Sequence, residues 1–167
     1  MSKEILEQST AQFLEGIVQK HYSFSQHLDN QVNILVGVST AIFLFSLPQF
    51  LNGPESKIFL VLAITSGMAL FVGLFAIHPP RFMRKRGQEE SIAYNKNIAR
   101  HQSSGEYHKH LRGILDDKEA IIQQYAVEIY NVSRYYYRPK RKLFHVARNI
   151  LVIGIFITLV LFTTQIF

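Results

Sequence analysis

Three long stretches without a charged side chain limit what this 167-residue chain can fold into. They are residues 32–51, 58–77 and 150–167, each 18 to 20 residues long and free of Asp, Glu, Lys and Arg. An α-helix rises about 1.5 Å per residue, so about 20 apolar residues cross the roughly 30 Å hydrocarbon core of a bilayer. We therefore predict three transmembrane helices at these positions.

The basic residues beside these stretches predict the orientation of the chain. Arg81 follows the second stretch with three more basic residues close behind it, and "RYYYRPKRKLF" (134–144) precedes the third. Lys and Arg beside a span collect on the cytoplasmic side. We therefore expect residues 1–31 and 78–149 in the cytoplasm and the C-terminus outside, with no removable signal peptide.

The segments around the predicted spans also have helical patterns. Before the first span, apolar residues recur at steps of three and four, which predicts an amphipathic helix over residues 1–31 that leads into the membrane. "HPP" (78–80) should end the second helix, because proline lacks the backbone N–H and forces extended geometry. The predicted fold class is all-α: a three-span transmembrane helical bundle on a small cytoplasmic helical base, built from residues 1–28 and 88–138.

The cytoplasmic segment between the second and third spans contains its own start signal. Ser103 with Glu106 three residues later is a capping-box pattern. Apolar residues then alternate steps of three and four over residues 107–136, a heptad seam interrupted once by Lys118. This pattern predicts about 30 residues of helix, on the order of 45 Å long. The polar residues 88–101 are also predicted to be helical.

Two sets of residues are predicted to pack helices together, either within one chain or between copies. One set lies in the heptad seam: Leu111, Ile114, Ile121, Tyr125, Ile129 and Val132. The other consists of small residues four apart in the spans, such as Ala69 and Gly73, which allow close helix approach. The sequence leaves open whether these sets pack the chain itself or form a homo-oligomer.

The basic residues near the spans are candidates for binding an anion. Lys and Arg at a cytoplasmic membrane face gain about 1 kcal/mol each from anionic lipids, which favours a lipid collar. Arginine forks and stacking tyrosines also suit a nucleotide, which is the alternative. The candidates are Arg84, Lys85, Arg86, Arg134, Arg138, Lys140 and Arg141. No nucleic-acid-binding motif is present, so we expect no DNA or RNA partner.

A polar collar and a proline also mark the edges of the spans. The collar before the first span consists of Asp29, Asn30, Gln31 and Asn33. We expect Asp29 to pair with an arginine such as Arg81 or Arg148. Pro139 permits a kink before the third span.

The chain shows no pattern typical of catalysis. It has no cysteine, no glycine-rich phosphate loop and no nucleophile-elbow serine. His108 and His110 are two residues apart, which does not bring them together on a helix, and "DDKE" (116–119) is typical of a solvated helix face. We therefore predict no enzymatic activity, no cofactor and no bound metal.

Three stretches together resemble one known family. "LDNQVNILVGVSTAI" (28–42), "HPPR" (78–81) and "EIYNVSRYYYRPKRKLFHVARNILVIGI" (128–155) look like the transmembrane effector domain of the bacterial Pycsar antiphage systems. The resemblance implies a bacterial inner-membrane protein that assembles and damages the membrane when a nucleotide second messenger appears on phage infection. Pycsar members commonly carry a separate cyclic-nucleotide-binding domain, for which we expect no room in this chain.

The resemblance and the residues together lead to one expected function and one alternative. We expect a defence effector that oligomerises and disrupts or permeabilises the inner membrane, with lipids and further copies of itself as partners. Its trigger is expected to be a cyclic nucleotide or a partner protein that senses or synthesises one. The alternative is a membrane anchor that forms no pore and recruits a soluble partner through its cytoplasmic helices.

Overall fold

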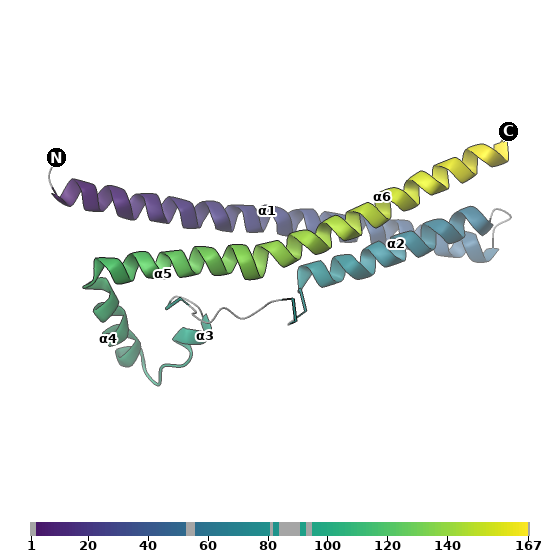
Figure 1. Cartoon of the computed structure of the whole chain (residues 1–167). Helices are drawn as coiled ribbons and strands as arrows, with labels where there is room; N and C mark the ends of the chain where they lie inside the picture. The colour runs from purple at the N-terminus through teal and green to yellow at the C-terminus, as the bar shows by residue number, and fades with distance from the viewer. Residues whose placement is uncertain (1–2, 53–55, 81, 84–90, 93–94, 167) are drawn as a thin grey trace. The chain divides into compact units, whose positions relative to one another are not determined.

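The computed structural model of the chain describes residues 3–52, 56–80, 82–83, 91–92 and 95–166 (Figure 1). These residues form helices and turns, with no strand in any of the described ranges, which confirms the all-α fold class. The helices are α1 (Lys3–Asn52), α2 (Ser56–Ile77), α3 (Asn95–Ile98), α4 (Ser104–Leu115), α5 (Lys118–Asn131), the π-helix η1 (Val132–Tyr137) and α6 (Arg138–Ile166).

The chain divides into two compact units. The base unit contains Met1–Ser25 and Arg84–Tyr137, and the span unit contains Gln26–Met83 and Arg138–Phe167. Three helical stretches, Gln12–Leu51, Lys57–Ile77 and Lys118–Thr164, are long and apolar enough to cross a membrane. The prediction of three membrane-spanning helices is therefore confirmed.

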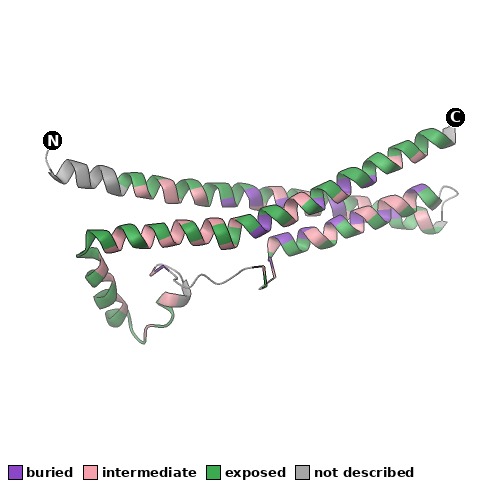
Figure 2. Ribbon diagram, in the orientation of Figure 1, coloured by how far each residue is buried: buried purple, intermediate pink, exposed green. Residues whose placement is uncertain are grey.

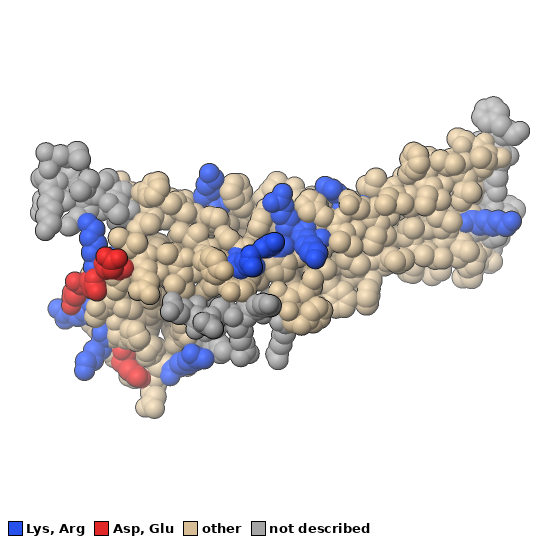
Figure 3. All heavy atoms as spheres, viewed as in Figure 1, with Lys and Arg blue, Asp and Glu red and all other residues tan. Residues whose placement is uncertain are grey.

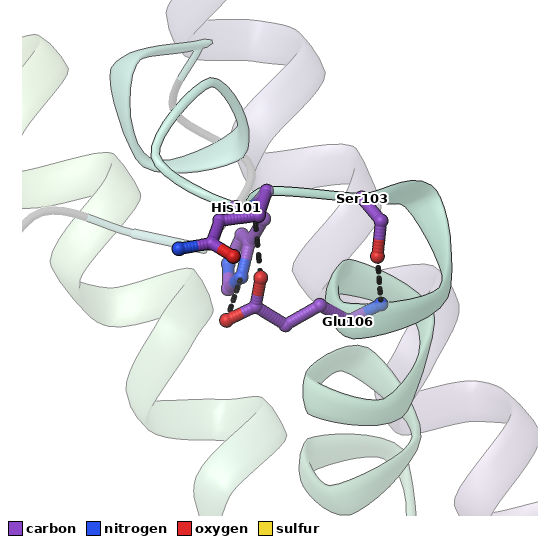
Figure 4. Close-up of polar contacts among 4 residues, drawn as sticks. His101, Ser103 and Glu106 are labelled. Atoms are coloured by element: carbon purple, nitrogen blue, oxygen red, sulfur yellow. Dashed lines mark hydrogen bonds and ion pairs between the residues drawn. The ribbon is translucent and has the colours of Figure 1, made fainter.

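Helix ends follow the local chemistry of the sequence. α2 ends at Ile77, directly before "HPP", as predicted. At the start of α4, the Ser103 hydroxyl accepts a hydrogen bond of 3.2 Å from the backbone N–H of Glu106. The Glu106 carboxylate in turn reaches back and accepts from the N–H of Gln102, at 2.8 Å (Figure 4). The predicted capping box is present, but the Glu106 carboxylate accepts from the N–H of Gln102 and not from that of the N-cap residue Ser103.

The prediction of one uninterrupted helix after Ser103 is wrong. α4 ends at Leu115, and α5 begins at Lys118, the residue that breaks the heptad seam. Asp117 is the N-cap of α5: its carboxylate accepts a hydrogen bond from the N–H of Glu119, at 2.9 Å. Asp favours this position because its side chain satisfies an N–H that has no partner within the helix. One of the three carboxylates of "DDKE" (116–119), which were expected on a solvated helix face, therefore starts a new helix.

The joint predicted at Pro139 takes the form of a change in helix type. The six residues of η1 are π-helical, and Pro139 is the second residue of α6. Proline has no N–H to donate to the carbonyl four residues earlier, and its ring clashes with that carbonyl. A wider π-turn just before the proline relieves this conflict. The boundary between the two units falls at the end of this π-helix.

The span unit packs through small residues. A Cβ atom on Gly73 of α2 would lie 2.8 Å from Val36 Cγ2 of α1, and one on Gly67 would lie 3.2 Å from the Phe43 ring. A Cβ atom on Gly154 of α6 would collide with Thr65 of α2. Figure 2 shows the buried positions of these helices as narrow patches within largely exposed surfaces. Close backbone approach, which only small residues allow, therefore holds these helices together.

Glycine substitutions test this packing. We expect Gly154→Ala to lower the stability of the purified protein by about 1–3 kcal/mol, the usual cost of overpacking a filled site. Gly37 of α1 has nothing within 4 Å of an added Cβ, so Gly37→Ala is the matched control and should not lower stability. Thermal unfolding in one detergent measures both variants. Equal stability of Gly154→Ala and the unchanged protein would contradict the packing.

Candidate functional site: a buried ion pair at the start of α6

A buried ion pair joins α1 to α6 in the span unit. The ammonium group of Lys140, in the first turn of α6, donates a hydrogen bond to the Asp29 carboxylate of α1. Lys140 is only 3% exposed, whereas the Asp29 side chain is 37% exposed. A buried ammonium group is strongly destabilising without a partner, so Asp29 is what makes the burial of Lys140 tolerable.

Helical periodicity explains why Lys140 points inward. Four buried residues of α6, Lys140, Ala147, Leu151 and Gly154, are separated by steps of seven, four and three, and Pro139 beside Lys140 is also buried. Residues at such steps lie on one face of a helix. Lys140 therefore continues the packed face of the span beyond its charge-free part. Asp29 lies one residue after Leu28, which belongs to the buried face of α1.

The other described cations of this region face outward. Arg134 of η1 and Arg138, Arg141, Lys142 and Arg148 of α6 are all exposed. Figure 3 shows Lys and Arg side chains gathered over the first part of α6, followed along that helix by a surface without charge. The Arg141 guanidinium also lies 3.4 Å from the His145 ring. The structure thus divides the predicted anion-binding cations into two groups. Lys140 forms an ion pair with Asp29, whereas Arg134, Arg138 and Arg141 are exposed and accessible to lipid headgroups or a nucleotide. Arg84, Lys85 and Arg86 lie outside the described residues.

The remaining residues of the predicted polar collar lie around Asp29 on α1. The Gln31 amide contacts the ring of His27 one turn earlier, at 3.0 Å. Asn30 and Asn33 are exposed. The structure pairs Asp29 with Lys140. Arg148, one of the two arginines expected as its partner, contacts Asn149 at 3.1 and 3.3 Å. Arg81 lies outside the described residues.

A second polar cluster lies within the base unit and centres on Glu128 of α5. Its carboxylate accepts hydrogen bonds from the hydroxyl of Tyr22, at 2.5 Å, and from the hydroxyl of Ser91. The neighbouring Ile92 N–H donates to the side chain of Gln124, at 2.8 Å. Glu128 therefore ties both α1 and the segment before α3 to α5.

The same carboxylate affects the titration of Tyr22, which lies ten residues before the first charge-free stretch. The hydrogen bond to Glu128, partial burial and the negative charge of Glu128 raise the pKa of Tyr22 from 10.0 to about 12. A raised pKa means that the protonated phenol is the favoured partner of Glu128. The resulting stabilisation is complete below pH 10.0 and is lost only as the pH rises through about 12. At physiological pH this contact is constant and does not act as a switch.

The predicted packing residues fall into the two units. Those of the heptad seam are partly buried in the base unit: Leu111, Ile114, Ile121, Tyr125, Ile129 and Val132. Ala69 and Gly73 are buried in the span unit, where Gly73 lies against α1. Among the described residues, no group of three His, Asp or Glu side chains is placed to hold a metal ion.

Comparison with known families decides what kind of membrane protein this is. The model of the Pycsar effector protein domain matches residues 13–166, which include both Asp29 and Lys140. The chain belongs to this family. No curated protein and no solved structure matches it significantly. This Pycsar effector domain, with its three membrane-spanning helical stretches, is therefore a membrane effector of antiphage defence.

Sequence reasoning missed two features of this Pycsar effector domain. The burial of Lys140 could have been found by extending the small-residue face of the third span backwards by one heptad, from Ala147 to Lys140. The cluster around Glu128 had no comparable signal. Its members are separated by 37 and 106 residues in the sequence, so only the folded chain brings them together.

Separate substitutions of the two ion-pair partners should give unequal losses. Asp29→Asn removes the negative charge beside the buried Lys140 ammonium, so the loss should approach the roughly 3–5 kcal/mol seen for broken buried pairs. It should stay below that range because Asp29 is 37% exposed. Lys140→Met removes the buried charge and leaves a carboxylate that water can reach, so its loss should be smaller.

Thermal unfolding of both single variants and of the double variant measures this difference. The double variant should be more stable than Asp29→Asn, because it has no unpaired buried charge. Lys142→Met, which removes an exposed cation two residues away, is the control and should be neutral. Equal losses in the two single variants would contradict the assignment of Lys140 as the buried partner.

Proposed function

We propose that this Pycsar effector domain oligomerises in the bacterial inner membrane and permeabilises it when a nucleotide second messenger, or a partner protein that senses or makes one, triggers it. Residues 1–31 and 78–149 then lie in the cytoplasm and the C-terminus lies outside. The chain acts without enzymatic chemistry, and its partners are membrane lipids and further copies of itself.

The Asp29–Lys140 pair is the observation that carries this proposal. An effector that damages its own cell's membrane must stay closed until it is triggered. In the span unit, α6 is paired with α1 through an ion pair whose cation is almost fully buried. Arrangements in which the two charges are separated but still buried are strongly destabilised. The ion pair therefore gives the bundle two discrete states: a closed state with the pair formed and an open state in which both charges are hydrated.

The base unit is suited to receive the trigger. The boundary between the two units falls between Tyr137 and Arg138, directly after the π-helix η1. A ligand or partner that repacks α5 therefore acts on the chain that leads into Lys140. The exposed cations Arg134, Arg138 and Arg141 can hold anionic lipid headgroups or the phosphate of a nucleotide.

Dye uptake during phage challenge tests the proposal. Cells that carry the chain with its neighbouring genes should admit a membrane-impermeant DNA dye after challenge, before phage are released. Replacement of residues 150–167 by an unrelated transmembrane helix of equal length should abolish both dye uptake and protection, while the protein still reaches the membrane.

A sealed membrane during full protection would contradict permeabilisation. Protection that survives the replacement of residues 150–167 would support the alternative function as an anchor for a soluble partner. Dye uptake in cells that carry the chain with a catalytically inactive messenger synthase would contradict control by a nucleotide.

A further inference from the structure

Three hydroxyl-bearing side chains lie on the buried face of the span unit, beside apolar ones such as Val32 and Leu151. Ser39 and Ser46 of α1 and Ser66 of α2 are each 0% exposed. With Val32 and Pro79, these serines are the largest fully buried side chains in the described part of the chain. Many large apolar side chains lie on the exposed surfaces of the helices, among them Phe45, Phe71 and Phe156 with exposed fractions of 61%, 62% and 66%.

The three serine hydroxyls do not hold the helices together. Ser46 donates to the backbone carbonyl of Phe43, at 3.2 Å, and Ser66 donates to that of Leu62, at 2.6 Å, so each hydrogen bond stays within its own helix. Ser39 Oγ is buried without any hydrogen-bond partner. A buried hydroxyl without a partner costs roughly 1–3 kcal/mol. Alanine would fill the position of Ser39 at lower free energy, so packing in the closed state does not explain the hydroxyl of Ser39.

The hydroxyls form a row through the middle of the span unit. Ser39 and Ser46 are seven residues apart on one face of α1, a separation of about 10 Å along the helix. Gly67 of α2 lies against Phe43 of α1, which sets the depth of α2 relative to α1. Ser66 precedes Gly67, so its depth lies between those of Ser39 and Ser46. The row therefore covers the centre of the first span, where a pathway for water would face its highest barrier.

We propose that Ser39, Ser46 and Ser66 line the water-filled path through which this protein permeabilises the membrane. This inference rests on the proposed permeabilisation and names its pathway. When the helices separate, Ser46 and Ser66 exchange bonds within their own helices for bonds to water and Ser39 gains its first partner, while the outer apolar side chains stay in lipid. Because the spans contain no charged residue, the path admits small hydrated ions of either sign.

Single-cysteine variants give a direct test, because the natural sequence contains no cysteine. The variants are Ser39→Cys, Ser46→Cys and Ser66→Cys in the full chain, expressed with its neighbouring genes. The matched controls are Leu44→Cys and Met68→Cys, two residues from Ser46 and Ser66 on the exposed surfaces of the same helices. Cells are treated with a charged, membrane-impermeant thiol reagent before and after phage challenge, and dye uptake is recorded in the same cultures.

The three inner positions should react faster after challenge than before it. A minor open state is populated at roughly 0.1–10% at rest, so full opening should raise the rate of modification by about tenfold or more. The two control positions should stay unreactive, because the reagent does not dissolve in lipid. Dye uptake without modification of the inner positions would overturn this inference and leave the proposed function intact. A membrane that admits neither dye nor reagent after challenge would overturn both this inference and the proposed permeabilisation.

A second set of variants covers the case in which a cysteine disturbs the fold. Ser39→Ala removes a hydroxyl without a partner, so the protein should be at least as stable as the unchanged one while the dye uptake rate falls severalfold. Thr163→Ala, which removes an exposed hydroxyl from α6, should leave dye uptake unchanged. Unchanged dye uptake in a stable Ser39→Ala, Ser46→Ala, Ser66→Ala triple variant would overturn the assignment.

Discussion

The span unit depends on the pairing of Lys140 with Asp29. Small residues such as Gly73 and Gly154 also pack its helices, but they give close approach and no charge-specific partner. Because lipid is as apolar as the helices, burial alone does not drive helices together in a bilayer. The pairing of a buried ammonium group with a carboxylate therefore adds what the apolar packing lacks: a fixed register between α1 and α6, and a large penalty for intermediate positions.

Features that depend on local chemistry could be predicted from the sequence. The charge-free stretches predicted the membrane-spanning helices because length and apolarity alone decide whether a helix can cross a bilayer. The start of α4 directly after its N-cap Ser103 and the end of α2 before Pro79 followed from backbone hydrogen bonding within a few residues. The family was recognised from three separate stretches around the spans, and the match over residues 13–166 confirms it.

Features that depend on distant contacts could not be predicted in the same way. Its position beside the third span placed Lys140 among the cations predicted to bind lipid or a nucleotide, whereas the helical face on which it lies turns it towards Asp29. The break before α5 was hidden because Asp117 fits a helix surface as well as an N-cap. Glu128 gains its role only when residues far apart in the sequence meet at its carboxylate. In each case the residue type permitted two environments, and tertiary packing selected one.

The central claim is that separation of α6 from α1 at this pair opens the membrane path. A chain with Asp29→Cys and Lys140→Cys can be bridged by a short bifunctional thiol reagent, with each single-cysteine chain as the control, because no other cysteine is present. Without the bridge, the double variant should admit a membrane-impermeant dye before any phage challenge. With the bridge, dye uptake should stop even during challenge and return on reduction. Equal dye uptake with and without the bridge would contradict the account.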